Sequence, residues 1–197
     1  MQVFRFKDAI IHVKDIKVEG WCTGLEYFQG RWIMGHWNTP PRVEMVSEEG
    51  DILHTLTTHS SGNDLFEKPA YIRVDNTTDN HRILVSDWGK KTVYMLGSER
   101  QLLQAFTLST FREPRGLAAV GEGQVLVADS GTDTLQLLDI NTGRWRTVLR
   151  REELQLVPNS LVYNPAKRCV FVGGSEDEVR VYTLSKWIKA LVFSLIM

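Results

Sequence analysis

The sequence predicts an all-β fold built from repeated units of short strands. The main evidence is a proline that recurs with almost constant spacing: Pro69, Pro114 and Pro158 stand 45 (114 − 69) and 44 (158 − 114) residues apart. Phe66 and Phe111 precede the first two of these prolines by three positions. A repeat in the forties made of short strands and turns is typical of a β-propeller, in which blades of four antiparallel strands are arranged radially.

Each repeat also carries a turn motif after its second strand. Val85-Ser86-Asp87-Trp88-Gly89 corresponds to Val127-Ala128-Asp129-Ser130-Gly131 in the next repeat, and Val172-Gly173-Gly174-Ser175 stands at this place in the last one. A fainter copy lies upstream, where Arg31 to Trp37 mirror Arg82 to Trp88. Asp and Ser side chains in such turns bond to backbone amides two residues on. We therefore expect about four blades, at 21–61, 66–109, 111–150 and 157–184.

The residue types of the best-defined repeat indicate four strands in order. Gly116 to Val120 is small and apolar, as expected for an innermost strand crowded around a central channel. Gln124 to Ala128 is a nearly continuous apolar run, which is typical of a strand covered on both faces by adjacent blades. Helical character is confined to a short stretch around 150–154. The expected strands are 116–120, 124–128, 134–138 and 145–149, and in the preceding repeat 71–74, 82–86, 92–96 and 102–106.

The two ends of the chain depart from the repeat. Residues 1–20 are expected to form an N-terminal strand and linker; because charges are scattered through them, we do not expect a signal peptide. Residues 185–197 form an apolar tail, which is either a final strand or the point where the chain stops, or changes reading frame, before a further blade. We favour the second interpretation because the repeat breaks off near Leu184. An unfinished ring leaves a strand edge unpaired, so we expect self-association through an open blade edge.

The overall composition is that of an ordinary globular domain. The chain has 197 residues, of which 43% are hydrophobic and 24% charged, and its formal net charge is −1. This charge gives no general attraction to DNA or to an anionic membrane. Cys22 and Cys169 are far apart and lack a CxxC partner, which argues against a disulfide framework or a cysteine-rich zinc site. We expect a reduced, cytoplasmic protein without a cofactor.

The repeat resembles the NHL repeat. The match is closest in the third repeat, at Phe111, Pro114, Gly116, Leu117 and the turn from Val127 to Gly131. The second repeat keeps Phe66, Pro69, Asp75, Val85, Asp87 and Gly89, but it has Ala70-Tyr71 where the family favours a glycine pair. The resemblance covers roughly 21–184 and is specific in two of the four repeats. NHL propellers usually have six blades, so the resemblance implies an incomplete set; a closed four-bladed ring is the alternative.

The resemblance also implies a class of function. NHL propellers often form the C-terminal part of tripartite-motif proteins, behind RING or B-box modules and a coiled coil, where they select a protein or an RNA stem-loop. This chain has neither a Cys/His cluster nor heptads, so any ubiquitin-ligase activity would need a RING module absent from it. The resemblance therefore implies a non-catalytic recognition module. A purely structural spacer is a further alternative.

The expected binding face is the rim formed by the loops before each innermost strand and between the second and third strands. Long charged side chains on loops are usually just solvated, so no single one of them indicates a binding site. The rim residues as a group are the candidate contact surface. Trp88 is its sharpest member, because a tryptophan at a turn tip buries little without a partner. The candidate contacts are Lys68, Tyr71, Trp88, Lys90, Lys91, Arg112, Arg115 and Asn159, with Thr132, Asp133 and Glu176 beside them.

Both a protein and an RNA fit this set of side chains. Cations and aromatics on one rim could bind an acidic peptide, or they could stack on and neutralise an RNA loop. Acidic residues offset the basic ones, whereas RNA-binding relatives concentrate positive charge there. The mixed pattern favours a protein partner and leaves RNA as the alternative; the acidic residues are Glu67, Asp87, Glu113, Asp133 and Glu176.

An enzymatic function is the least favoured reading. Some propellers resembling lactonases hold calcium in the channel through Glu, Asn and Asp, and a lyase relative binds zinc through histidines. Asp87, Asp129 and Asn159 could be imagined to converge, but the two aspartates are the repeated turn residues and fit a structural cap. The five histidines share no position; His36 stands out only because it replaces the turn aspartate in the first repeat. We expect no catalytic residues and no metal.

Overall fold

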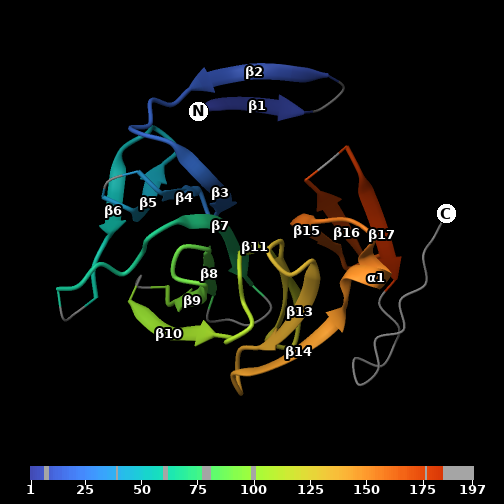
Figure 1. The fold of residues 1–197 in the computed structure, drawn as a ribbon. Helices are drawn as coiled ribbons and strands as arrows, with labels where there is room; N and C mark the ends of the chain where they lie inside the picture. The colour runs from blue at the N-terminus through green and yellow to red at the C-terminus, as the bar shows by residue number, and fades with distance from the viewer. Residues whose placement is uncertain are drawn as a thin grey trace.

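The computed structural model describes residues 1–6, 9–38, 40–59, 62–76, 81–98, 101–175 and 177–183. These residues form an all-β structure whose antiparallel sheets are four blades of a β-propeller, as predicted (Figure 1). In every blade the strands lie in chain order, from the innermost strand outward. The predicted tail at 185–197 and the rim residue Glu176 lie outside the described residues.

The strands of the four blades are as follows. Blade 1 consists of β3 (Cys22–Phe28), β4 (Arg31–His36), β5 (Arg42–Ser47) and β6 (Ile52–Leu56). Blade 2 consists of β7 (Pro69–Asp75), β8 (Arg82–Asp87), β9 (Thr92–Leu96) and β10 (Leu102–Thr107). Blade 3 consists of β11 (Pro114–Gly121), β12 (Gln124–Asp129), β13 (Thr134–Asp139) and β14 (Arg144–Leu149). The described part of blade 4 consists of β15 (Pro158–Asn164), β16 (Cys169–Gly174) and β17 (Val179–Thr183).

Two further elements lie outside the blades. The helix α1 (Arg151–Leu154) stands where short helical character was expected, and its buried Leu154 joins the packing between blades 3 and 4. At the N-terminus β1 (Gln2–Phe6) and β2 (Ile10–Asp15) pair as a hairpin, where the sequence suggested a single strand and linker. The second strand was not predicted because residues 10–15 carry none of the repeat motifs. Among the described residues no helix has the length and hydropathy needed to cross a membrane.

The innermost strands of blades 2 and 3 begin earlier than the sequence suggested, at the repeat prolines Pro69 and Pro114. Pro114 pairs with Asp129, but the ladder then resumes at Leu117 opposite Val127, so β11 carries a bulge directly after its first residue. Shifts of register occur at the same place in β3, β7 and β15. A proline has no N–H to give to a ladder and is therefore tolerated at a strand start or a bulge. The bulge bends the strand and re-aims a side chain toward the end of the blade.

The core lies between adjacent blades rather than within one. Separate clusters of buried apolar residues join blades 1 and 2, blades 2 and 3, and blades 3 and 4; Phe66, Phe111 and Leu154 are fully buried members of the three. The innermost strands approach so closely that a Cβ on Gly24 would lie 2.7 Å from the Ala70 carbonyl oxygen. A Cβ on Gly116 would lie 2.8 Å from the Leu161 nitrogen. Glycine is required at both positions because backbone atoms leave no room.

The four blades form an arc whose two end faces are apolar and exposed. The innermost strands pack in chain order, β3 against β7, β7 against β11 and β11 against β15, and Figure 1 shows the β1–β2 hairpin on the open side. On blade 1, Leu25 and Tyr27 are 48% and 46% exposed. On blade 4, Val162 and Val179 are 52% and 67% exposed. These faces have the residue types that neighbouring blades cover elsewhere in the arc.

Candidate functional site: the rim of the arc

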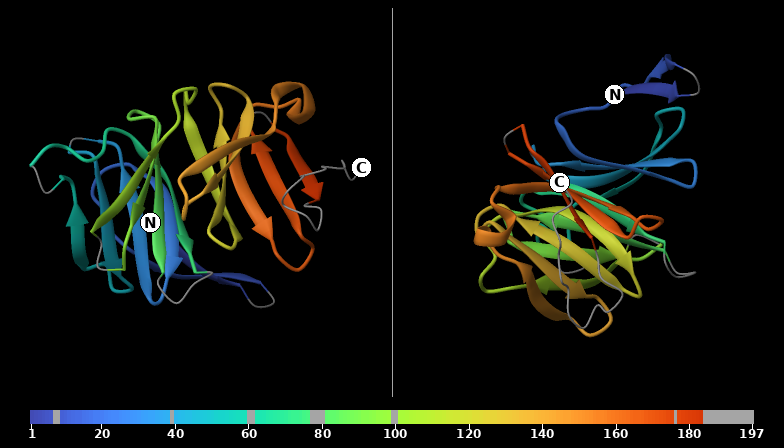
Figure 2. Two further views of the ribbon diagram at one scale, coloured as in Figure 1. Left: turned by 90° about the horizontal axis from the view of Figure 1, so that it is seen from below. Right: turned by 90° about the vertical axis from the view of Figure 1, so that its right-hand side faces the viewer.

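The candidate site is the end of the arc at which the innermost strands begin and the second strands end. The loops before β3, β7, β11 and β15 and the turns that follow β4, β8, β12 and β16 all lie there. The left view of Figure 2 shows these connections along one edge, with α1 at the same end. Every predicted contact residue in the described part of the chain therefore lies on or next to one rim.

The repeated turn aspartates are structural caps. One carboxylate oxygen of Asp87 accepts the Glu67 N–H at 2.7 Å, and the other accepts the Lys68 and Lys90 N–H groups, each at 2.9 Å. Asp129 accepts the N–H groups of Arg112, Glu113 and Gly131 and the Thr132 hydroxyl in the same way. Both aspartates are almost completely buried. Because these bonds occupy both carboxylates, the residues fix the rim loops to the blades and cannot serve a substrate.

Blade 1 replaces this cap with a buried charged cluster. His36 stands at the turn-aspartate position and is fully buried, with its Nε2 3.1 Å from Glu44 Oε2. Arg42 Nε donates to the other Glu44 oxygen at 2.6 Å. Neither ring nitrogen of His36 has a partner with hydrogen-bond geometry among the described residues, so Nε2 contacts Glu44 as a close polar neighbour only. Burial lowers the pKa of His36, opposed by Glu44, so the neutral imidazole is favoured.

Three predicted contact residues from three different blades meet at the mouth of the arc. Asn159 Oδ1 accepts the Tyr71 hydroxyl at 2.9 Å and Arg115 Nη1 at 3.2 Å. Arg115 Nη2 donates to Glu113 Oε2 at 3.1 Å, which keeps the guanidinium in an ion pair. Burial raises the pKa of Tyr71, so its hydroxyl remains a donor. Each side chain lies within or next to the bulge of its innermost strand, which explains their convergence.

A second group of residues forms an aromatic groove over blades 1 and 2. We call it the tryptophan groove; it is an open hollow of about 600 Å³, lined by Gly20, Trp21, Trp37, Asn38, Lys68 and Trp88. The rings of Trp37 and Trp88 are 6.0 Å apart at 63°, an edge-to-face contact. The Lys68 ammonium lies 4.0 Å from the Trp88 ring centroid, and the Arg115 guanidinium lies 5.8 Å from it. Trp88 therefore connects the groove to the mouth of the arc.

The structure corrects the expectation for Trp88. The sequence suggested a tryptophan at a turn tip with little to cover it, but the ring is half-buried against Lys68 and Trp37. Its neighbours Trp21 and Trp37 were missed. The sequence did contain a signal for Trp37. Arg31 to Trp37 mirror Arg82 to Trp88, which places Trp37 where Trp88 stands in the next blade. Trp21 precedes β3 and has no counterpart in the other repeats.

The remaining rim residues are more dispersed. Lys90, Lys91 and Arg112 are exposed and join neither the groove nor the mouth cluster. No carboxylate in the described part of the chain forms an ion pair with them. Thr132 is held by Asp129, and Asp133 lies 3.4 Å from Arg151 Nε. As far as the chain is described, the rim thus presents cations without ion-pair partners over blades 2 and 3.

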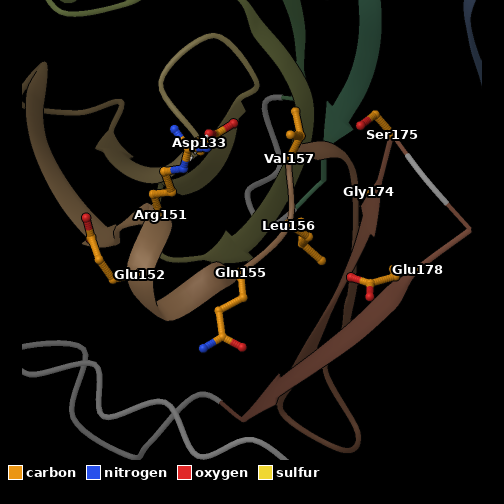
Figure 3. A pocket seen from close by; sticks show the side chains of 9 residues that line it. All are labelled: Asp133, Arg151, Glu152, Gln155, Leu156, Val157, Gly174, Ser175 and Glu178. Carbon is orange, nitrogen blue, oxygen red and sulfur yellow. Dashed lines mark ion pairs between the residues drawn. The ribbon is translucent and has the colours of Figure 1, made fainter.

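A larger hollow of about 660 Å³ lies between blade 3, α1 and blade 4. Figure 3 shows Glu152 and Gln155 on the α1 side and Glu178 on the facing side. Its charged lining consists of the carboxylates of Asp133, Glu152 and Glu178 with the single guanidinium of Arg151. In the part of the chain that the structure describes, no three His, Cys, Asp or Glu side chains are grouped to hold a metal ion. Without aromatic walls this hollow is a weaker candidate than the tryptophan groove.

Comparison with known proteins supports the fold and leaves the family open. No protein-family model and no curated protein sequence matches the chain. The computationally designed Ika4 protein matches with a TM-score of 0.59 at 15% identity, over 86% of this chain and 94% of that one. A functionally unknown protein from Desulfotomaculum acetoxidans DSM 771 matches with a TM-score of 0.69 at 14% identity, over 97% of this chain and 60% of that one.

The third similar structure has a named repeat type. The WD40 β-propeller domain of Doa1 matches with a TM-score of 0.64 at 20% identity, over 92% of this chain and 55% of that one. The chain thus spans about half of the Doa1 domain's chain and three-fifths of the Desulfotomaculum protein. At these identities the likeness establishes the β-propeller class and nothing finer.

Proposed function

We propose that this propeller is a non-catalytic recognition module that binds a protein partner through its rim. The observation that carries the proposal is the gathering of Trp21, Trp37 and Trp88 into one open groove with Lys68, whose ammonium lies over the Trp88 ring. Tryptophan and arginine dominate the binding energy of protein interfaces, in patches that water leaves on association. Apolar surface of this kind costs free energy while it faces solvent.

The chemistry of the rim supports binding over catalysis. The two carboxylates that could have acted in the channel, Asp87 and Asp129, are occupied by backbone amides. Asn159, the third candidate, is held by Tyr71 and Arg115. A general base or a metal ligand must have a free lone pair directed at a substrate or an ion. The groups described here instead stiffen the surface on which a partner would rest.

The wider context of the proposal rests on the NHL-like repeat. We propose that the propeller selects substrates within a tripartite-motif-like ubiquitin ligase or regulatory protein. The test is to express the full coding sequence of its gene in cells and to measure ubiquitin conjugates on the proteins that the propeller captures. Conjugates that disappear when the rim is altered support this role. If the captured proteins carry the same amount of ubiquitin when the rim is altered, the propeller is a binding module that takes no part in ubiquitin transfer.

The rim itself is tested by charge reversal at exposed positions. Lys90→Glu with Arg112→Glu reverses two cations whose side chains are solvated. Arg31→Glu with Lys167→Glu is the matched control, since these exposed cations lie at the opposite end of the blades. Immobilised variants are incubated with lysate, and the captured material is divided between mass spectrometry and RNA sequencing.

We expect mass spectrometry to identify proteins that the control variant captures and the rim variant does not. Equal capture by both variants would contradict rim binding. RNA, rather than protein, lost from the rim variant would replace this proposal with RNA stem-loop recognition, which the same cations could support.

A further inference from the structure

We infer that the tryptophan groove takes an acidic peptide, and that a bulky apolar side chain of this peptide lies between Trp21 and Trp37 while a neighbouring carboxylate reaches Lys68. This deepens the proposed function and rests on it. The inference follows from two properties of the groove: its walls are apolar and open, and its cation, Lys68, forms no ion pair with a carboxylate in the described part of the chain.

The apolar walls of the groove are exposed to solvent, and a bound partner would cover them. Trp21 is 72% exposed and Trp37 is 37% exposed, although both rings face a concave hollow. The edge-to-face contact of Trp37 with Trp88 leaves a notch rather than a flat platform. An aromatic or aliphatic side chain placed there would cover parts of several indole rings at once. Such anchors in apolar notches are the usual centres of binding energy.

The positive side is defined by Lys68. Its ammonium lies over the Trp88 ring, and no carboxylate in the described part of the chain forms an ion pair with it. Asp87 accepts three backbone amides, and Glu113 pairs with Arg115, so neither of these two carboxylates is free to pair with Lys68. A carboxylate of the ligand would find an ammonium that an aromatic wall shields from water, which strengthens the pairing.

Two other ligand classes fit the groove less well. Aromatic cages commonly take a ligand cation, but Lys68 already occupies the face of Trp88 and would repel a second positive charge. A nucleobase would need an open ring face for stacking, and the face of Trp88 next to Lys68 is taken. The 63° angle between Trp37 and Trp88 also forms no parallel-sided slot for a flat base. A peptide that offers an apolar side chain beside a carboxylate is not repelled by Lys68 and does not need an open ring face.

The probe is a fluorescein-labelled peptide with a central phenylalanine flanked on both sides by aspartate and glutamate. Two matched peptides isolate its features: one replaces phenylalanine by alanine, and the other replaces every acid by its amide. A single-stranded RNA octamer with the same label is the fourth probe. Binding is followed by anisotropy at low salt and again with added sodium chloride, and the protein's own tryptophan emission reports contact with the indole rings.

Two substitutions test the two halves of the groove. Trp21→Ala removes an exposed wall, and Lys68→Met removes the charge while keeping an apolar side chain of similar length. Leu103→Ala, exposed on the outer strand β10, and Lys167→Met, exposed at the opposite end, are the matched controls. Thermal melts of each variant establish that the fold is retained.

We expect each groove substitution to weaken the phenylalanine peptide at least about tenfold, and each control to change it less than about twofold. Added salt should weaken binding to the wild type but have little effect on the Lys68→Met variant. The alanine and the amide peptides should each bind about tenfold more weakly than the parent.

Equal affinity for the parent and amide peptides, or unchanged affinity in Trp21→Ala, would overturn the inference. Preferential binding of the RNA octamer would overturn it as well. If the groove fails but Lys90→Glu with Arg112→Glu still releases protein partners, the rim proposal survives and only the ligand class is wrong. If neither variant set has an effect, both proposals fail.

Discussion

The hydroxyl of Tyr71 in blade 2 donates to Oδ1 of Asn159 in blade 4 at 2.9 Å, across the mouth of the arc. These residues are 88 positions apart in the chain, and the blade that separates them contributes Arg115 to the same acceptor. The bond therefore connects non-adjacent blades at a point where the interblade clusters do not reach. It gives the mouth of the arc a fixed side-chain arrangement instead of three independent loops.

Tyr71→Phe should lower stability modestly. The substitution removes one hydrogen bond but leaves Asn159 with its Arg115 donor, so we expect a loss of about 1 kcal/mol. Asn159→Ala should cost more, because it leaves the Tyr71 hydroxyl and one Arg115 donor without their acceptor. Urea unfolding of both single variants and of the double variant measures the coupling between the two residues. Fully additive losses would show that the bond does not join the blades energetically.

Asp129→Ala should be strongly destabilising. The carboxylate accepts three backbone N–H groups and the Thr132 hydroxyl at a site that is almost completely buried. Leaving these donors unpaired should lower the free energy of unfolding by about 3 kcal/mol. The same change at the exposed Asp51, whose side chain lies outside any cap, is the control and should stay within about 0.5 kcal/mol. Comparable losses at both positions would contradict the capping role.

Mild acid should destabilise the protein through His36. Burial lowers the pKa of this imidazole in the folded state, so the unfolded chain takes up the proton first as the pH falls. The stabilising contribution is complete well above the unfolded pKa of about 6.5 and is lost as the pH falls through the folded value.

His36→Gln cannot take up this proton and should flatten that part of the stability profile. Thermal melts of both proteins between neutral pH and about pH 5 provide the comparison. The same slope in both proteins would assign the acid sensitivity to other groups.

The exposed ends of the arc should cause self-association. Leu25 and Tyr27 on blade 1 and Val162 on blade 4 lie on faces that resemble the covered faces of the inner blades. Leu25→Lys with Val162→Lys should shift the protein toward monomer in sedimentation velocity, because a charge on each face opposes apolar contact. Leu103→Lys on the outer strand of blade 2 is the control. A monomer at every concentration in the unaltered protein would contradict the prediction.

The sequence was sufficient for the blades but not for the site. Repeat spacing predicts strands because turn chemistry and apolar alternation are local, and Asp87 and Asp129 act as the turn caps that their repetition suggested. The tryptophan groove depends on how two adjacent blades are placed, which no single repeat encodes. Its key member Trp21 lies outside the repeated motif altogether. The network of Tyr71, Arg115 and Asn159 was missed for a related reason, since it depends on bulges that shift the register by one residue.

The bulge that follows the first residue of every innermost strand separates two roles within the blade, the pairing of the strands and the presentation of a side chain at the opening. Its extra residues stand outside the ladder, so their side chains can vary without disturbing the pairing of the strands on either side. The four blades carry Thr23, Ala70, Arg115 and Asn159 at this place, an alcohol, a methyl, a guanidinium and an amide. The same strand pairing therefore recurs in each blade, while the residue at the bulge differs from blade to blade around one opening. New binding preferences could then arise there by single substitutions that leave the architecture intact.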